Sequence, residues 1–174
     1  MKTLETERLI LRKYKISDFN AVHSYASCVE NILYLPWEPN SEDVTREFIN
    51  RAIAQAEKNP ICEYEYAVVI KKTDALIGGC WISPSDGDQA MLGWCLHRDY
   101  WNNGYCTELG MALLKFCFDE LNLRRVYSFS HVENIGSYRV MEKIGMRREG
   151  LSLENHPPKS CPPKNTAMSL YTPC

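Results

Sequence analysis

Three consecutive strand-like runs in the middle of the chain constrain its fold most. Apolar residues dominate positions 64–71, 76–82 and 90–97, each run having the length of a single β-strand. Short polar turns at 72–74 and 84–88 separate these runs, which favours an antiparallel meander. Helical patterns lie on both sides of the meander, so the chain is expected to build a sheet that helices cover.

The flanking patterns complete the order of elements. Before the meander we expect a strand from Glu7 to Lys13, a helix that Ser17 caps and that runs to about Cys28, a loop at 31–39, and a helix that begins after Ser41 and stops at 59–60. After the meander we expect a helix at about 104–121, a strand at 123–132, a helix at 134–144, and two strands separated by a proline-rich segment, 155–164. The order β-α-α-β-β-β-α-β-α-β-β predicts an α/β (α+β) fold with a mixed, mostly antiparallel sheet flanked by helices, in one domain, 1–174.

Composition excludes several classes of function. A chain of 174 residues with 45% hydrophobic and 24% charged residues is typical of one soluble globular domain. The net charge of −2 provides no electrostatic reason to bind nucleic acid or an acidic membrane. No apolar run has the length of a membrane span, and the first five residues lack the pattern of a signal peptide. We therefore expect a cytoplasmic protein with neither nucleic acid nor membrane as a partner.

The eight cysteines do not form a recognisable metal or redox motif. No two of them stand at CxxC spacing, and no histidine pair completes a zinc pattern. Most lie in apolar segments, so we expect buried thiols in a reducing compartment and no metal site. Cys161 and Cys174 lie in polar or terminal stretches and are expected to be exposed. A zinc or redox protein is therefore disfavoured.

The segment from Gly93 to Glu108 carries the clearest chemical signal. A strand ends there, a short polar loop follows, and an amphipathic helix begins at a glycine. The start of a helix offers unpaired N–H groups and a positive dipole to an anion, and Gly104 lets the backbone approach closely. From spacing alone, an ordinary strand-to-helix turn at Asn102-Asn103-Gly104 is the better explanation. Neither GxxxxGK[ST] nor GxGxxG after a strand is present, which disfavours P-loop kinases and Rossmann dehydrogenases.

The wider sequence resembles the GNAT acetyltransferase superfamily. Residues 100–108 are similar to its acyl-CoA motif, an [RQ]-x-x-G-x-[GA] loop that opens the central helix, with Trp101 and Cys106 at the two variable ends. Trp at the first of these positions is usual in the RimJ/RimL-like branch of ribosomal-protein N-terminal acetyltransferases. Residues 6–12 (TERLILR) resemble the first strand of that branch, and 134–146 (NIGSYRVMEKIGM) resemble its N-x-x-S-x-x-[VL]-x-E-K-[LI]-G-F helix. The resemblance covers about residues 6–150 in the expected order.

The resemblance implies that acetyl-CoA is the acyl donor, without a metal. Its pyrophosphate is expected on the loop N–H groups of Asn102, Asn103, Gly104, Tyr105, Cys106 and Thr107. Its pantetheine arm is expected to pair with Trp94, Cys95, Leu96 and His97 in a gap between two parallel strands, with Asn134 also facing the cofactor. A backbone N–H there polarises the thioester carbonyl, and the acceptor amine attacks it directly.

The proton donor departs from the pattern of the superfamily. In many members a tyrosine at the position of Met141 protonates the departing thiolate, and methionine has no proton to donate. Asn134, Ser137 and Met141 share one helix face, so Ser137 is the acid that we predict. The alternative is a structural serine that serves the start of the helix.

The acceptor side is less specified by the sequence. Trp37 and Glu38, in the loop between the first two helices, are expected to wall the acceptor pocket, unless Trp37 plugs the core instead. His97, His131, Glu108 and Glu154 are candidates for a base, and none is singled out. The expected acceptor is a primary amine of a protein N-terminus or a small molecule, and the enzyme is expected to be a monomer or homodimer. The alternative is a CoA-binding regulatory module without turnover.

Overall fold

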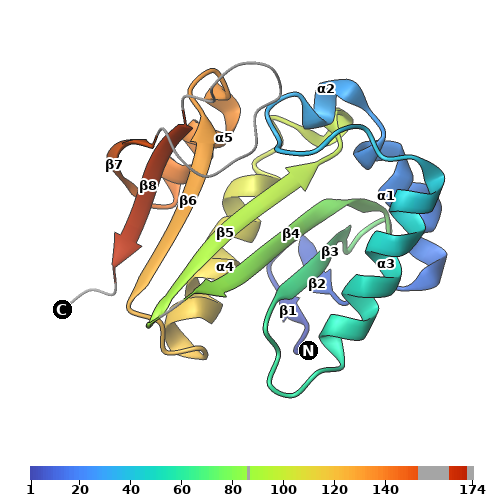
Figure 1. Cartoon of the computed structure of the whole chain (residues 1–174), viewed down its shortest axis with the longest axis horizontal. Helices are drawn as coiled ribbons and strands as arrows, with labels where there is room; N and C mark the ends of the chain where they lie inside the picture. The colour runs from blue at the N-terminus through green and yellow to red at the C-terminus, as the bar shows by residue number, and fades with distance from the viewer. Residues whose placement is uncertain (86, 153–164, 172–174) are drawn as a thin grey trace.

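A computed structural model describes residues 1–85, 87–152 and 165–171. One sheet contains eight strands in the order β1-β2-β3-β4-β5-β6-β8-β7 (Figure 1). Every neighbouring pair is antiparallel except β5 and β6, which are parallel, so the prediction of a mixed, mostly antiparallel sheet is confirmed. The strands are β1 (Leu4–Glu5), β2 (Leu9–Arg12), β3 (Tyr64–Ile70), β4 (Leu76–Ser85), β5 (Gln89–Leu96), β6 (Arg125–His131), β7 (Arg147–Ser152) and β8 (Asn165–Tyr171).

Helices cover both faces of this sheet. The α-helices are α1 (Phe19–Ala26), α2 (Val29–Ile32), α3 (Glu42–Ala56), α4 (Tyr105–Asp119) and α5 (Ile135–Lys143), and two short 3-10 helices are η1 (Ile16–Asp18) and η2 (Arg98–Tyr100). Tyr66 and Val68 of β3 pack in one core with α4, whereas Ala67 between them packs in a second core with α1 and α3. Because successive side chains of a strand point to opposite faces, α4 lies on one face and the α1–α3 pair on the other.

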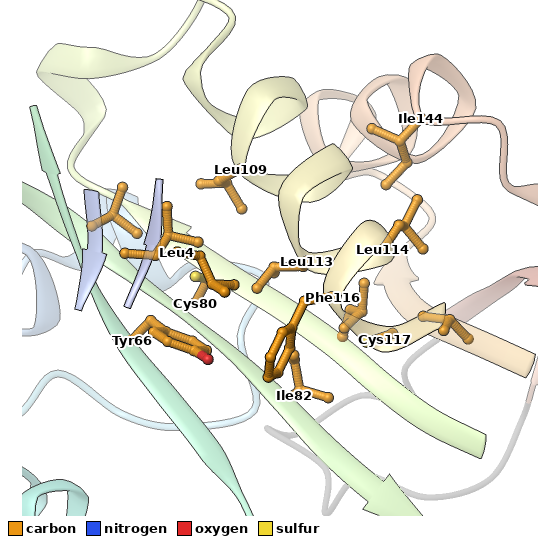
Figure 2. Packing of buried hydrophobic residues seen from close by; sticks show 14 of the residues in the cluster. Leu4, Tyr66, Cys80, Ile82, Leu109, Leu113, Leu114, Phe116, Cys117 and Ile144 are labelled. Carbon is orange, nitrogen blue, oxygen red and sulfur yellow. The ribbon is translucent and has the colours of Figure 1, made fainter. Parts of the chain in front are cut away.

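The main core lies between the sheet and α4. Leu109, Leu113 and Phe116 recur at helical spacing and are buried against the strands, as Figure 2 shows for their side chains. On the strands they meet residues such as Tyr66 and Ile82, both of which are fully buried. The predicted apolar stripe of this helix is therefore confirmed. Because α4 is anchored in this way, its first turn is held in a fixed place relative to the sheet.

The expected start of the first helix at Ser17 is wrong. Residues 16–18 form the 3-10 helix η1, and Asp18, not Ser17, precedes α1. The carboxylate of Asp18 is buried and accepts two hydrogen bonds of 2.8 Å from the Arg12 guanidinium and one of 2.8 Å from the Lys15 N–H. This pairing with a strand residue draws Asp18 inward, and a local capping pattern contains no information about it.

Other boundaries differ from the sequence expectation by a few residues. The loop expected at 31–39 lies two residues later, at 33–41, because the short helix α2 extends to Ile32. Ser41 caps α3 as predicted, since its Oγ accepts a hydrogen bond of 3.3 Å from the Val44 N–H. β4 continues through Pro84 to Ser85, beyond its predicted end at Ile82. The proline-rich segment 155–164 lies outside the described residues, and among the helices that are described none is long and apolar enough to span a bilayer.

Candidate functional site

The two parallel strands of the sheet pair over their first three residues and then diverge toward their C-terminal ends. Within the described strands, pairing joins residues 89–91 of β5 to 125–127 of β6 and ends at Met91 and Tyr127. Both strands continue beyond this point, to Leu96 and His131, and Figure 1 shows them separating. Where they part, the Ser128 hydroxyl donates a 2.8 Å hydrogen bond to the Leu92 carbonyl. The divergence that the family resemblance implies is therefore present.

Beyond the point of divergence, the backbone of β5 on the side of β6 pairs with no other described strand. The His97 N–H donates a 2.8 Å hydrogen bond to the Ile77 carbonyl, on the β4 side. Because successive residues of a strand direct their backbone groups to opposite edges, Leu96 and Trp94 direct theirs toward β6. The Leu96 carbonyl accepts hydrogen bonds from the Trp101 indole N–H at 2.7 Å and from the Asn31 amide at 3.3 Å. The N–H and carbonyl of Trp94 and the N–H of Leu96 thus line the edge that an extended ligand can pair with.

The start of α4 lies just beyond this edge and has the backbone of an anion site. Gly104 precedes the helix with a φ of +79°, and Asn102 has a φ of +61°. The first hydrogen bond of the helix runs from the Glu108 N–H to the Gly104 carbonyl at 3.1 Å. The N–H groups of Tyr105, Cys106 and Thr107 precede this bond and point out of the helix start. Together with the helix dipole, they form an environment that favours phosphate.

Side chains from the residues just before β2 hold this helix start in place. Arg8 donates to Glu108 Oε2 at 2.6 Å and to the Asn103 carbonyl at 3.0 Å, and its guanidinium lies 4.6 Å from the centre of the Tyr105 ring. The other carboxylate oxygen of Glu108 accepts from the Thr6 hydroxyl at 2.5 Å and from the Arg8 N–H at 2.7 Å. Sequence reasoning took residues 6–12 only as a strand and missed this function. A carboxylate four residues into the helix, matched with an arginine near the N-terminus, was the signal available.

These bonds decide whether Glu108 is a candidate for the catalytic base or a residue that supports the loop. Burial disfavours the charged carboxylate, but the hydrogen bonds from Thr6 and Arg8 outweigh it and hold the pKa of Glu108 below its ordinary value. A carboxylate with several donors and a lowered pKa is a poor acceptor for a proton at neutral pH. Glu108 therefore supports the loop and is a weak candidate for the base.

Of the two described histidines that are candidates for the base, His97 and His131, each has its Nδ1 engaged in a hydrogen bond. The Nδ1 of His97 accepts a 3.3 Å hydrogen bond from the Asp99 N–H, and the Nδ1 of His131 accepts one of 3.3 Å from the Glu133 N–H. With Nδ1 as acceptor, a neutral imidazole carries its proton on Nε2, which then acts as a donor. This tautomer suits a structural role better than that of a base. Glu154, the fourth candidate, lies outside the described residues.

The first turn of α5 contains the predicted proton donor. The Asn134 Oδ1 caps the helix by accepting a 3.1 Å hydrogen bond from the Ser137 N–H, as predicted for its local role. Ser137 is partly buried, and within the described part of the chain its hydroxyl makes no hydrogen bond. Met141, one turn further on, is 1% exposed and belongs to the main core, so it does not line an open surface beside Ser137. Tyr138 packs against the same core.

The 33–41 loop crosses the diverging strands on the face opposite to α4. Tyr34 stacks on His131 of β6 with 5.3 Å between ring centres, and Trp37 meets Trp81 of β4 edge to face at 6.0 Å. The Trp81 indole covers Gly93 of β5, since a Cβ added to Gly93 would lie 1.9 Å from the ring. Trp37 is partly exposed and belongs to neither core, so the plug role is wrong for it. Glu38, next to it, is exposed.

The cysteines of the site are unreactive in this state. Burial raises the pKa of the Cys95 and Cys106 thiols to about 12 each, so both stay neutral at physiological pH. Cys80 and Cys117 are buried as expected, whereas Cys62 is exposed. All six cysteines in the described residues are free thiols, and Cys161 and Cys174 lie outside them.

Comparisons with known proteins agree with this geometry. The family model for the acetyltransferase (GNAT) domain matches residues 8–147. YnaD, an uncharacterised N-acetyltransferase of Bacillus subtilis (strain 168), is 36% identical over 163 residues, which cover 92% of this chain and 88% of YnaD. The crystal structure of a GNAT-family acetyltransferase from Bacillus anthracis superposes with a TM-score of 0.87 at 31% identity, covering 98% of each chain.

A structure of Mycobacterium smegmatis RimJ with CoA-disulfide has the same fold, with a TM-score of 0.83 at 17% identity over 98% of this chain and 87% of that one. The family model spans both the helix start at Gly104 and the diverging strands, and the Bacillus relatives align almost end to end. The chain therefore belongs to the GNAT acetyltransferase family and is an acetyl-CoA-dependent N-acetyltransferase.

Proposed function

We propose that this enzyme transfers the acetyl group of acetyl-CoA to a primary amine, of a protein N-terminus or a small molecule, by direct attack in a ternary complex. The observation that carries the proposal is the divergence of β5 and β6 directly beside the start of α4. An extended thioester fits between the strands while its phosphates meet the helix. The single sheet, in which all described strands take part, supports one catalytic domain for 1–174.

The donor is proposed to lie along two parts of the backbone. The loop N–H groups from Asn102 to Thr107 bind the pyrophosphate, where Gly104 leaves space for it. The pantetheine arm pairs with the free edge of Trp94 and Leu96, whereas Cys95 and His97 direct their backbone groups to β4 and contribute only their place in the strand. Asn134 uses its amide oxygen as a cap, which leaves its amide nitrogen for the cofactor.

The chemical step needs a polarised carbonyl and a proton for the leaving group. The amine nitrogen forms a bond to the acetyl carbon, and the C–S bond breaks as the tetrahedral intermediate collapses. The departing sulfur takes the hydroxyl proton of Ser137 and leaves as the CoA thiol. The attacking nitrogen loses one proton to water, and water returns a proton to the Ser137 oxygen, which ends as a neutral hydroxyl. A backbone N–H of the β5 edge stabilises the oxyanion, and one such donor is worth about 2.7–4 kcal/mol.

The acceptor is proposed to approach from the face that the 33–41 loop covers. Trp37 lies against Trp81 there, and Glu38 follows it on an exposed turn, where a carboxylate suits a cationic amine. An α-amine with a pKa of about 7.7–8.0 is neutral for roughly a tenth of the time at pH 7, whereas a lysine near 10.4 almost never is. Since neither His97 nor His131 is a clear base, we propose that a weakly basic amine is the preferred acceptor.

The test compares matched acceptors in a thiol-release assay with acetyl-CoA. A peptide with a free N-terminus and no lysine is expected to give a higher kcat/KM than the same peptide with its N-terminus blocked and one internal lysine. Faster turnover of the lysine peptide would reject the preference for a weak base. If CoA binds in calorimetry but no amine of a broad panel releases thiol, the chain is a CoA-binding regulatory module, the alternative that Met141 in the tyrosine position favours.

A further inference from the structure

Asn31 is a buried polar residue that the proposed mechanism does not use. It lies on α2, is 8% exposed, and reaches the end of β5. Its Nδ2 donates a 3.3 Å hydrogen bond to the Leu96 carbonyl, and its Oδ1 accepts one of 3.1 Å from the Arg98 N–H. One side chain thus bonds both the last residue of the strand and the first residue of the turn after it.

These two bonds determine where the free edge of β5 ends. The Leu96 carbonyl points toward β6, and it also accepts the Trp101 indole N–H at 2.7 Å. With two donors on this oxygen, an extended ligand can pair with Trp94 and with the Leu96 N–H but not with the Leu96 carbonyl. Because η2 and the loop before α4 follow directly, the same bonds also set the direction in which the chain leaves for the helix start.

The segment that holds Asn31 also reaches the acceptor side. Tyr34 and Trp37 follow it in sequence and contact His131 of β6 and Trp81 of β4. On the other side, Glu30 forms an ion pair of 3.1 Å with Arg98. The segment from Glu30 to Trp37 therefore contacts the ends of β5 and β6 as well as β4, on both sides of the divergence.

We infer that Asn31 is a positioning residue for acetyl transfer, which fixes the donor strand at Leu96 relative to the loop that covers the acceptor. This inference rests on the proposed function. Asn31 touches neither the reacting atoms nor the phosphates, and it acts through Leu96 and Arg98. Its loss removes the side-chain acceptor of the partly buried Arg98 N–H and the amide donor to Leu96, and lets the end of β5 move against the 33–41 loop.

The test uses Asn31→Leu, which is close in size and can make neither hydrogen bond. We expect kcat/KM to fall by about 10–100-fold, because a displacement of about 1 Å between reactants can change a rate by about 10²-fold. We expect kcat to fall and the KM for both substrates to rise, and the Kd for CoA in calorimetry is expected to rise as well. Glu30→Gln is the matched control, since it removes the exposed ion pair with Arg98 but no backbone contact.

Three outcomes overturn the inference. They are wild-type kcat/KM for a folded Asn31→Leu variant, a lowered Tm with unchanged kinetics, and an equal kinetic loss in Glu30→Gln. If Asn31→Leu does not fold, Asn31→Asp serves instead, because it keeps the acceptor for Arg98 and loses only the donor to Leu96. Wild-type kinetics in that variant would also overturn it. Should the wild type turn over no amine, the proposed function fails, and an unchanged Kd for CoA in the variant still decides against Asn31.

Discussion

Gly104 shows how one residue determines whether the start of α4 can receive an anion. Its φ of +79° lies in the left-handed region, which is accessible to glycine and costs other residues about 1–2 kcal/mol. A Cβ added there would lie 3.4 Å from the Arg8 guanidinium, an ordinary contact. The constraint on this position is therefore one of backbone conformation, together with the space needed for a phosphate.

We predict that Gly104→Val weakens CoA binding while the fold survives. A β-branched residue at positive φ shifts the first turn, and losing one charge-assisted hydrogen bond of about 1.5–3 kcal/mol raises the Kd by about tenfold or more. Calorimetry with CoA measures this. Gly87→Val is the control, since Gly87 has a similar φ of +73° on an exposed turn. If Gly104→Val binds CoA as the wild type does, the pyrophosphate lies elsewhere.

Ser137 is the residue on which the proposed proton transfer depends. We predict that Ser137→Ala lowers kcat by about 10²–10⁴-fold, the usual contribution of general acid catalysis, and leaves the Kd for CoA nearly unchanged. Steady-state kinetics at saturating acetyl-CoA measure the effect, with Ser24→Ala on the exposed side of α1 as the control. Turnover at the wild-type rate would remove Ser137 from the mechanism and favour its structural role.

At the scale of elements, the contact between the residues just before β2 and the first turn of α4 holds in position the loop that is proposed to bind phosphate. Glu108 has a side chain only 17% exposed, and it accepts hydrogen bonds from Thr6 and Arg8. The two elements lie far apart in sequence, and α4 packs across the strands between them. A single carboxylate thus joins the N-terminal strand to the helix start that is proposed to bind CoA.

This joint is predicted to make stability depend on acid pH. The folded-state pKa of Glu108 lies below its ordinary value of about 4.3, so its contribution is present above that pH and is lost as the pH falls through the lower value. We predict that Glu108→Gln lowers the free energy of unfolding by about 1 kcal/mol at pH 7, since hydrogen bonds to charged groups exceed neutral ones by about that much. The difference from the wild type is expected to shrink toward pH 3.

Denaturant unfolding of both proteins between pH 3 and 7 measures this difference. The control is Glu57→Gln, which removes an exposed ion pair with Lys13 and should change stability little. A difference between Glu108→Gln and the wild type that stays constant with pH would show that the charge of Glu108 does not stabilise the fold.

At the scale of the whole molecule, two cores on opposite faces of one sheet bury three of the six described thiols. Cys80 and Cys117 lie in the main core and Cys95 in the second, where burial raises the pKa of each. Cys62 is exposed on the approach to β3. The reactivity of the thiols therefore reports on whether both cores are closed.

We predict that Cys62 is labelled rapidly by a thiol reagent at pH 8, and that Cys80, Cys95 and Cys117 are labelled only as fast as the protein unfolds. Mass spectrometry of the labelled peptides follows each site separately. In denaturant all four should react at once, which is the internal control. Rapid labelling of Cys80 in the native protein would show that the main core opens locally without global unfolding.

The sequence by itself determined the order of the main helices and strands, without β1 and α2, and it indicated the turn before α4 as the proposed anion site. Strand-length apolar runs, the helical stripe of Leu109 and Leu113, and the caps Ser41 and Asn134 are local patterns, and local backbone physics suffices to interpret them. The resemblance at residues 100–108 likewise identified the family, because its motif is contiguous.

Only the tertiary structure decided how these parts meet. The divergence of β5 from β6 depends on which strands become neighbours, and the burial of Met141 depends on how α5 packs. Asn31 and Glu108 act through residues more than sixty positions away, at distances that no periodicity encodes. Asp18, which is expected in the first turn after Ser17 and instead pairs with Arg12, shows the same limit. Such contacts arise from the packing of whole elements, so the chain reveals them only once it is folded.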